Sequence, residues 1–302
     1  MRRFGPIRTA LFVPGSRPDR VDKALNAGAD IIIIDLEDAV PLALKEETRS
    51  KVREKVLEHG GRKIIVRVNA IGSGFCQGDL DEVMVQPLGC VMLPKVESPE
   101  QIREINHRLV RLEEERGMDS GTVSIIPLIE SASAVQNIFP ILAEKTKPAR
   151  LLTAAFGAAD YSLDLGIEIT KQGSELDYPR SRIAVACRAA KIEPPLDTPF
   201  MIDLKDTVGL KADAMRAKQL GFQGKLCIHP NQIQACHAIF SPTKEEIQHA
   251  ERVIQAFEEA EAQGVAAIQL DGKFIDYPVV ERARRTLKIA EKMEGGKLRP
   301  HE

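Results

Sequence analysis

The sequence predicts an α/β fold, a closed parallel (βα)8 barrel with a C-terminal helical extension. Two observations support this prediction: eight stretches of strand length recur along the chain, and helix-like segments separate most of them. In such barrels the chemistry takes place where the strands end. The predicted strands are Arg8–Val13, Asp30–Glu37, Lys63–Asn69, Cys90–Glu97, Val123–Glu130, Arg150–Phe156, Thr198–Asp203 and Gly224–His229.

Turn and cap signals support the first units. The turn signal Pro14-Gly15 follows the first strand, and Pro18 opens a helix that Gly28 ends. The second strand contains four consecutive isoleucines, Ile31–Ile34, as expected of a parallel strand that is covered on both faces. A charged amphipathic helix over Lys45–His59 precedes the third strand.

Later helices are also marked. Pro99–Gly117 carries mixed charges typical of a solvated outer helix, and Tyr178–Lys191 is a helix that Pro194-Pro195 prevents from continuing. We therefore assign residues 1–240 to a barrel domain.

Residues 241–302 exceed the single helix that a barrel needs to close. They comprise helix Lys244–Gly264, an extended stretch Ala267–Ile275 and helix Val279–Met293. Such an extension covers the site or reaches a neighbouring subunit. The tail Gly295–Glu302 is expected to be disordered.

Composition excludes several classes of protein. The chain has 302 residues, 43% of them hydrophobic, and a net charge of −2, which provides no basic field for nucleic acid. Its apolar runs are too short to span a bilayer. Five scattered cysteines contain no CxxC pair, so we expect reduced thiols and a cytoplasmic location.

The predicted strand ends bring a ring of charged side chains to one rim. Asp160 lies just past the sixth strand, and the other members are Asp35, Glu37, Asp38, Arg67, Lys95, Glu130, Asp203 and His229.

Glu130 and Asp160 are the candidate metal ligands. They follow neighbouring strands, and two bare carboxylates at close range repel each other. Oxygen ligands with room for water and substrate suit magnesium. The alternative is that each residue caps a helix, Glu130 the one that follows it and Asp160 the segment Tyr161–Gly166.

Arg67 is the candidate anion-binding residue. It lies among apolar neighbours, and a buried guanidinium needs a partner. It could grip a carboxylate or stabilise an oxyanion, or it could form an internal ion pair with Glu37 or Asp38.

Glu37, Asp38 and Lys95 are candidates for orienting these groups. Together with Asp35, the two acids are too many to be metal ligands as well, so one or two would orient Arg67, Lys95 or a metal-bound water. The alternative is helix capping or a surface salt bridge. Lys95 could also form a Schiff base, although the acids nearby would raise its pKa.

Arg17, Arg20 and Lys23 flank the start of the first helix. A helix N-terminus with cations nearby is a plausible phosphate site, and Phe12 could stack on an aromatic base. The alternative is a charged helix face exposed to solvent.

Eight motifs make a resemblance specific. In chain order they are LFVPGSRPDR, DLEDAV, RVN, PKVE, IES, FGAAD, GKLCIHPNQ and GKFIDYPVVERA. Together they resemble the citrate lyase β-subunit and malyl-CoA lyase family (HpcH/HpaI aldolase superfamily) of magnesium-dependent carbon–carbon lyases. The resemblance implies a TIM barrel, a homo-oligomer that is a trimer or hexamer, and a thioester of CoA or of an acyl carrier as substrate.

The resemblance also implies roles for single residues. Glu130 and Asp160 match the Mg2+ ligands, and Arg67 matches the arginine beside the reacting carbonyl. Asp276 matches an acid/base that enters a neighbouring subunit's site. The positions that hold the CoA nucleotide are matched by Phe12, Arg17 and Lys23.

The expected reaction is cleavage of a 3-hydroxy-3-carboxyacyl-CoA, citramalyl-CoA or malyl-CoA, to acetyl-CoA and pyruvate or glyoxylate. Three alternatives remain open: a malyl-CoA thioesterase, a citrate lyase β-subunit that needs an acyl-carrier partner, and a CoA-binding module without activity. The segment Glu168–Glu175 could shape the acid pocket.

Overall fold

The computed structural model describes residues 4–60 and 63–295, and the chain divides into two compact units. The first unit is Ile7–Phe240, and the second is Ser241–Glu302 with Met1–Pro6, as far as these are described. The tail expected to be disordered falls outside the described residues, apart from Gly295 at its start.

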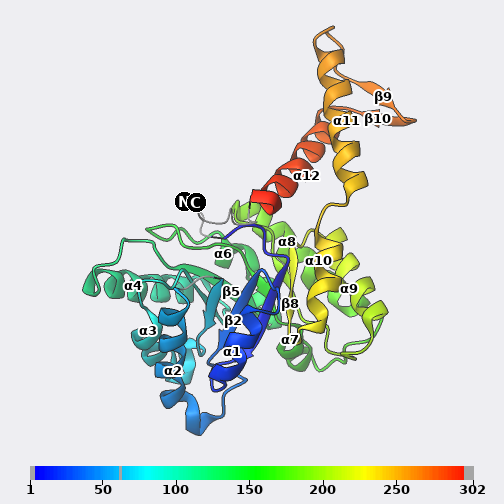
Figure 1. Ribbon diagram of the computed structural model, residues 1–302. Coiled ribbons are helices and arrows are strands. Elements are labelled where there is room, and N and C mark those ends of the chain that lie inside the picture. Colours follow the sequence, from blue (N-terminus) through cyan, green and yellow to red (C-terminus); the bar gives the residue numbers. More distant parts are fainter. Residues whose placement is uncertain (1–3, 61–62, 296–302) are drawn as a thin grey trace. The chain divides into compact units, whose positions relative to one another are not determined.

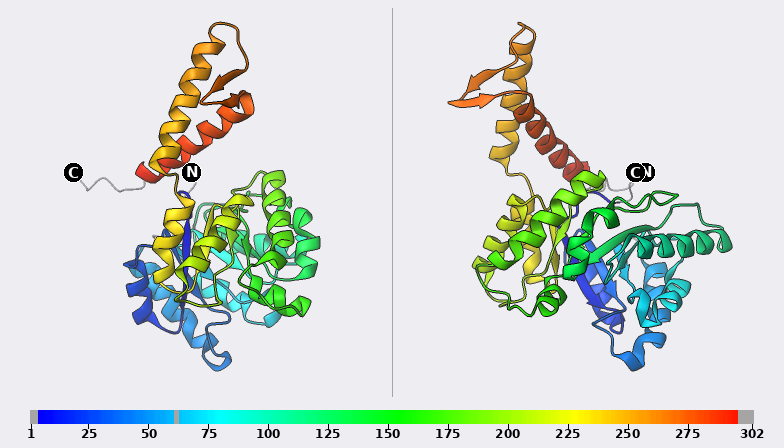
Figure 2. Two further views of the ribbon diagram at one scale, coloured as in Figure 1. Left: turned by 90° about the vertical axis from the view of Figure 1, so that its right-hand side faces the viewer. Right: turned by 180° about the vertical axis from the view of Figure 1, so that it is seen from behind.

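The first unit is built around a closed parallel barrel (Figures 1 and 2). Each strand pairs with the next, and β1 pairs with both β2 and β8, so the predicted barrel is confirmed. The strands are β1 (Thr9–Pro14), β2 (Ile31–Asp35), β3 (Ile64–Arg67), β4 (Cys90–Leu93), β5 (Ser124–Ile129), β6 (Ala155–Phe156), β7 (Leu196–Asp197) and β8 (Gly224–Cys227).

Helices surround these strands (Figure 2). They are α1 (Pro18–Leu25), α2 (Lys45–Glu58), α3 (Cys76–Val83), α4 (Pro99–Glu115), α5 (Ala132–Gln136), α6 (Ile138–Leu142), α7 (Ala158–Leu165), α8 (Asp177–Ala190), α9 (Thr207–Gln219) and α10 (Asn231–Phe240). Three 3-10 turns, η1 (Leu42–Leu44), η2 (Ile71–Ser73) and η3 (Ser174–Leu176), lie in the connections.

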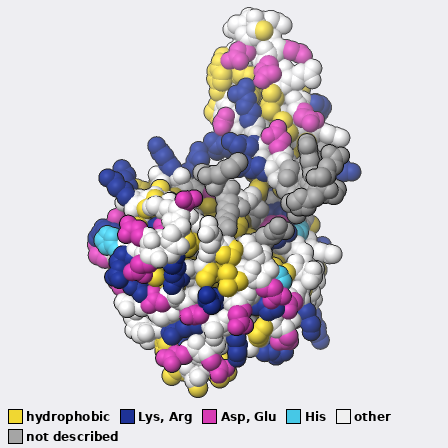
Figure 3. Space-filling view, turned by 60° about the vertical axis from the view of Figure 1, so that its left-hand side comes forward, with side chains coloured by type: hydrophobic (Ala, Val, Ile, Leu, Met, Phe, Trp, Pro, Cys, Tyr) yellow, Lys and Arg dark blue, Asp and Glu magenta, His cyan; other side chains and the backbone are white. Residues whose placement is uncertain are grey.

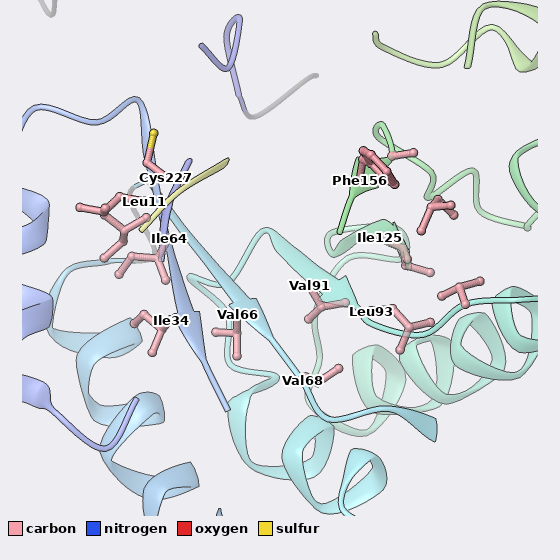
Figure 4. Packing of buried hydrophobic residues seen from close by; sticks show 14 of the residues in the cluster. Leu11, Ile34, Ile64, Val66, Val68, Val91, Leu93, Ile125, Phe156 and Cys227 are labelled. Carbon is pink, nitrogen blue, oxygen red and sulfur yellow. The ribbon is translucent and has the colours of Figure 1, made fainter. Parts of the chain in front are cut away.

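Alternation along the strands separates the packed core from the barrel interior. One set of side chains, which includes Ile34 and Val66, belongs to the apolar cluster between strands and helices (Figure 4). The other set points inward. Asp35 and Arg67 belong to this inner set and are register partners across β2 and β3, so they meet at the carboxyl ends of their strands.

The seventh strand differs from its prediction. The stretch Thr198–Asp203 was predicted as a strand, but β7 is Leu196–Asp197, directly after the two prolines. The loop after β7 contains apolar residues that give it the composition of a strand. They are apolar because part of this loop is packed against the barrel unit, where Phe200 is buried. Asp203 is therefore an exposed loop residue and no strand end.

The second unit has a small core of its own. Helices α11 (Lys244–Glu261) and α12 (Tyr277–Gly295) pack with a hairpin of β9 (Ile268–Leu270) and β10 (Lys273–Ile275), visible in Figure 1. Asp271 and Gly272 both have positive φ, as a tight two-residue hairpin turn requires. Phe257 and Ile275 are buried in its core.

Among the described helices, none combines the length and the apolar character that crossing a bilayer would need. On the face shown in Figure 3, acidic and basic side chains are interspersed on both units.

Candidate active site

Arg67 and Asp35 form the centre of the site. The guanidinium donates to both carboxylate oxygens of Asp35, from Nε at 2.7 Å and from Nη2 at 2.6 Å. Both side chains are almost completely buried. Burial opposes the charged form of Arg67, but the contacts with Asp35 outweigh it and raise the pKa of the guanidinium. Arg67 therefore forms an internal ion pair, but its main partner is Asp35 and not the Glu37 or Asp38 considered from the sequence.

Glu37 and Asp38 lie on the remaining side of Arg67. Nη1 of Arg67 is 3.1 Å from Asp38 and 3.0 Å from Glu37 Oε2, but the Glu37 contact lacks the geometry of a hydrogen bond. Burial raises the pKa of Glu37 to about 7, against the opposing effect of Arg67. Both acids thus contact the arginine that they were expected to orient.

Lys45 holds the loop that follows β2, and the sequence analysis did not identify it as a site residue. Its buried ammonium donates to the carbonyl oxygens of Leu36 and Glu37, at 3.0 and 2.9 Å, and to Asn69 Oδ1 at 2.6 Å. Asn69 in turn donates to Asp79 at 2.7 Å. Since Lys45 is part of a charged amphipathic helix, its burial had no signal in the sequence.

Glu130 is clamped between two backbone groups. Its Oε2 accepts the backbone N–H of Lys95 at 3.0 Å, and its Oε1 lies only 2.6 Å from the point where a Cβ on Gly157 would stand. Gly157 has φ −108°, so the absence of a side chain, rather than an unusual backbone, makes room for the carboxylate. The glycine of the FGAAD motif was the available signal for this close approach.

The charge of Glu130 is poorly balanced. The side chain is buried, and this burial, together with the carboxylates of Glu37 and Asp160, raises its pKa to about 8 although Arg67 and the Lys95 N–H oppose the shift. Because Glu130 lies against Gly157 at the start of α7, both predicted ligands are at the carboxyl end of the barrel. Asp160 lies in the first turn of α7, three residues after Gly157.

The capping alternatives do not hold for either acid. The helix after Glu130 is α5, and Ser131 caps it by accepting the N–H of Ala134. Helix α7 begins at Ala158, so Asp160 is inside the helix and not at its cap.

Lys95 extends over the same acids. Its ammonium lies 3.4 Å from Glu37 Oε1, and about half of the side chain is exposed. Burial would lower its pKa, but Glu37, Asp38 and Asp160 outweigh this and raise it, which favours the charged form over the free amine that a Schiff base needs. We call these seven residues the mouth cluster: Asp35, Glu37, Asp38, Arg67, Lys95, Glu130 and Asp160.

A hard divalent cation fits this cluster. Carboxylate oxygens are its preferred ligands, and an added positive charge would relieve the repulsion that raises the pKa of Glu130. Of the five acids in the mouth cluster, Glu130 and Asp160 have no cationic partner at hydrogen-bond distance among the described residues.

A second group of possible ligands has a simpler explanation. Donor atoms of Asp22, Glu58 and His59 lie within 4.8 Å of one another. The ammonium of Lys55 already contacts both Asp22 and Glu58 at 2.8 Å, so the cluster is an ion-pair network.

The three predicted CoA contacts differ in their exposure and in their partners. Phe12 lies inside the barrel mouth, with the centroid of its ring 4.9 Å from the guanidinium carbon of Arg67. One face of the ring is therefore already covered. Lys23 is exposed on α1, and Arg17, also exposed, precedes this helix in an ion pair with Asp19 at 2.9 Å.

Asp276 lies in the second unit, directly before α12. Its Oδ1 accepts the N–H of Val279 at 3.3 Å, so it also contributes to the start of that helix. Its acid/base role stays a prediction.

Residues 168–171 and Gly173, from the segment Glu168–Glu175, line a cavity of about 450 Å³ beside α7. Ala159 and Ser162 of α7 form one wall, and Phe200 lies on another. Neither Glu130 nor Asp160 lines this cavity. His229, expected at the rim, is exposed and accepts the N–H of Asn231.

Comparison with known proteins gives one family. A model described as HpcH/HpaI aldolase/citrate lyase matches residues 8–230. The chain belongs to the HpcH/HpaI aldolase/citrate lyase family. This membership confirms the family expected from the motifs and the class of enzyme, a lyase.

Relatives of this HpcH/HpaI protein include citrate lyase β-subunits and citramalyl-CoA lyases. The citrate lyase subunit beta of Leuconostoc mesenteroides is 37% identical over 94% of this chain and 93% of its own. The human mitochondrial citramalyl-CoA lyase is 30% identical over 95% of this chain and 86% of its own.

A solved structure is similar over nearly the whole chain. The CitE protein of Mycobacterium tuberculosis, in complex with magnesium, acetoacetate and coenzyme A, is 30% identical with a TM-score of 0.76. The match covers 96% of this chain and 100% of that chain.

Proposed function

We propose that the protein is a magnesium-dependent carbon–carbon lyase that cleaves a 3-hydroxy-3-carboxyacyl-CoA, citramalyl-CoA or malyl-CoA, into acetyl-CoA and pyruvate or glyoxylate. The observation that carries this proposal is the surplus of buried carboxylates around Arg67 at the carboxyl end of the barrel. Relatives named citramalyl-CoA lyase and the magnesium complex of CitE support it.

Glu130 and Asp160 hold the cation. Magnesium, when bound, acts as a Lewis acid on the hydroxyl and carboxylate oxygens of the substrate. The substrate hydroxyl would give its proton to water, the carbon–carbon bond would break to release the keto acid, and the electron pair of that bond would pass to the acetyl thioester as an enolate.

Arg67 stabilises the charge that develops on the thioester oxygen. Its contacts with Asp35 fix the plane of the guanidinium before substrate arrives, so no reorganisation is needed during the reaction. Glu37 and Asp38 hold the third nitrogen.

Asp276 completes the reaction as the acid. It delivers a proton to the acetyl carbon from which the keto acid has left, and it removes that proton in the reverse direction. Phe12, Arg17 and Lys23 are proposed to contact the CoA nucleotide. The five cysteines are buried free thiols, which supports a reducing compartment, the cytoplasm.

The decisive experiment offers the purified protein a panel of hydroxyacyl-CoAs with magnesium and identifies the keto acid released. Asp276→Asn should abolish turnover and leave CoA-ester binding intact, because asparagine still accepts the N–H of Val279. Asp271→Asn in the hairpin is the matched control and should stay active. Normal turnover by Asp276→Asn would refute the acid role.

We further propose a homo-oligomer, a trimer or hexamer, in which Asp276 acts in the barrel of a neighbouring subunit. Co-expression of Glu130→Gln with Asp276→Asn tests this directly, since each inactive chain supplies the group that the other lacks. Random mixing should restore about a quarter of the sites. Absence of activity in the mixed oligomer would contradict a shared site.

A second candidate is the β-subunit of a citrate lyase that acts on a citryl thioester of an acyl carrier. The higher identity to proteins named citrate lyase subunit beta favours it. Turnover of free CoA esters by the purified chain would exclude it. Release of free malate from malyl-CoA, without glyoxylate, would instead indicate a thioesterase.

A further inference from the structure

Lys95 has a backbone conformation that its local structure does not explain. Its φ is +54°, in the left-handed region, two residues after β4 ends. Three other described non-glycine residues share this region. Lys191 is the C-cap of α8, Asp271 lies in the hairpin turn, and Lys63 lies in the turn before β3. Lys95 is in neither a helix cap nor a hairpin, so its strain needs another reason.

Contacts on both sides hold the Lys95 backbone in place. Its N–H donates to Glu130 Oε2 at 3.0 Å, and its carbonyl oxygen accepts a long contact from Gln101 at 3.5 Å. Gln101 also completes the capping box of α4 with Ser98, so it is itself fixed. On the opposite side of the carboxylate stands Gly157, as described above.

The Lys95 side chain adds a third attachment. Its ammonium lies 3.4 Å from Glu37 Oε1, and Glu37 is buried beside Arg67. Both the ammonium and the backbone N–H of Lys95 therefore contact acids of the mouth cluster, Glu37 and Glu130 respectively.

We propose that Lys95 is a positioning residue for Glu130: its left-handed backbone turns the N–H toward the carboxylate and fixes that group for the cation. The inference rests on the proposed function, because it gives a reason for the geometry of a metal ligand. It assigns Lys95 no direct part in the reaction.

Two substitutions at position 95 separate the backbone from the charge. Lys95→Gly and Lys95→Ala both remove the ammonium, and both keep the N–H. Both variants lose the ammonium contact with Glu37. Glycine adopts the left-handed conformation freely, whereas alanine is strained in it. We expect magnesium to bind Lys95→Ala about tenfold more weakly than Lys95→Gly in calorimetric titration.

Lys191 provides the matched control. It is another left-handed lysine, and its conformation is explained by its place as the C-cap of α8. Lys191→Gly and Lys191→Ala should differ in thermal stability and bind magnesium equally. A similar difference in magnesium affinity at this position would show a global effect and overturn the inference.

The outcomes separate this inference from the proposed function. Wild-type protein that fails to bind magnesium would reject both. If the wild type binds magnesium and Glu130→Gln does not, the metal site stands. Equal affinities for the two variants at position 95, or a tighter Lys95→Ala, would then reject only the role of Lys95.

Discussion

Two buried charge clusters of the barrel unit differ in their charge balance. Besides the mouth cluster, the unit contains a balanced cluster formed by Arg180, Asp197, Asp213 and Lys225. Lys225 donates to both aspartates at 2.5 Å, and Arg180 contacts the same two at 2.9 and 2.7 Å. Two cations face two carboxylates, and each of the four side chains has an ion-pair partner, although Nη1 of Arg180 has no hydrogen-bond partner.

The pKa shifts favour the charged forms in the balanced cluster and the protonated carboxyl groups in the mouth cluster. In the balanced cluster, burial is outweighed by the partners, which lower the pKa of Asp213 and raise those of Arg180 and Lys225. In the mouth cluster five carboxylates meet two cations, and the pKa values of Glu37 and Glu130 rise to about 7 and 8. The balanced cluster is complete, whereas the mouth cluster is completed by protons or by a divalent cation.

Breaking the balanced cluster should have the largest effect on stability. Lys225→Met leaves the buried Asp197 and the partly buried Asp213 facing one arginine and should lower the free energy of unfolding by about 3–5 kcal/mol. Denaturant titration measures this loss. Lys211→Met, on the exposed face of α9, is the control and should change stability by less than about 0.5 kcal/mol. A loss of less than about 1 kcal/mol in the free energy of unfolding of Lys225→Met would contradict the view that Lys225 balances the two aspartates.

Removing a negative charge from the mouth cluster should raise the free energy of unfolding, whereas breaking the balanced cluster lowers it. Without magnesium at pH 8, Glu130→Gln should be more stable than wild type by on the order of 1–2 kcal/mol, because a poorly balanced charge is gone. Glutamine can still accept the N–H of Lys95. The same variant should lose magnesium binding and activity. If Glu130→Gln were clearly less stable than wild type under these conditions, the view that the mouth cluster carries surplus negative charge would be wrong.

Gly157→Ala should damage the site through shape alone. The backbone at Gly157 allows alanine, but the new Cβ would stand 2.6 Å from Glu130 Oε1. We expect magnesium affinity to fall about tenfold or more and stability to fall by about 1–3 kcal/mol. Gly72→Ala, where no atom lies within 4 Å of the new Cβ, should behave as wild type. Unchanged magnesium affinity in Gly157→Ala would show that Glu130 is not held there.

The pH dependence should also separate the clusters. The folded protein holds protons on Glu37 and Glu130 above their ordinary value of 4.5. Without divalent cation, stability from these groups therefore falls as pH rises from about 4.5 to 8. Asp213, with its lowered pKa, loses its contribution only in acid. Magnesium should accordingly raise the melting temperature more at pH 8 than at pH 6, and an equal rise at both would contradict this.

The sequence predicts the parts of this comparison that depend on pattern. The isoleucine run of β2 and the polar residues at the strand ends placed Asp35, Arg67 and Glu130 near one rim. The two-residue strand β7 gives too short a pattern, and the apolar loop after it was mistaken for the strand.

Pair geometry could not be predicted in the same way. That Asp35 is the main partner of Arg67 depends on the register of β2 against β3, which becomes visible only when the sheet is formed. The burial of Lys45 and the left-handed backbone of Lys95 are likewise consequences of contacts between distant segments.

Calorimetric titration of magnesium into the wild type and into Asp160→Asn at pH 8 tests the divalent-cation site most directly. We expect one ion per chain in the wild type and loss of binding in the variant, since the neutral amide leaves Glu130 as the sole charged ligand. Absence of binding in the wild type, or equal affinity in Asp160→Asn, would contradict a cation shared by these two carboxylates.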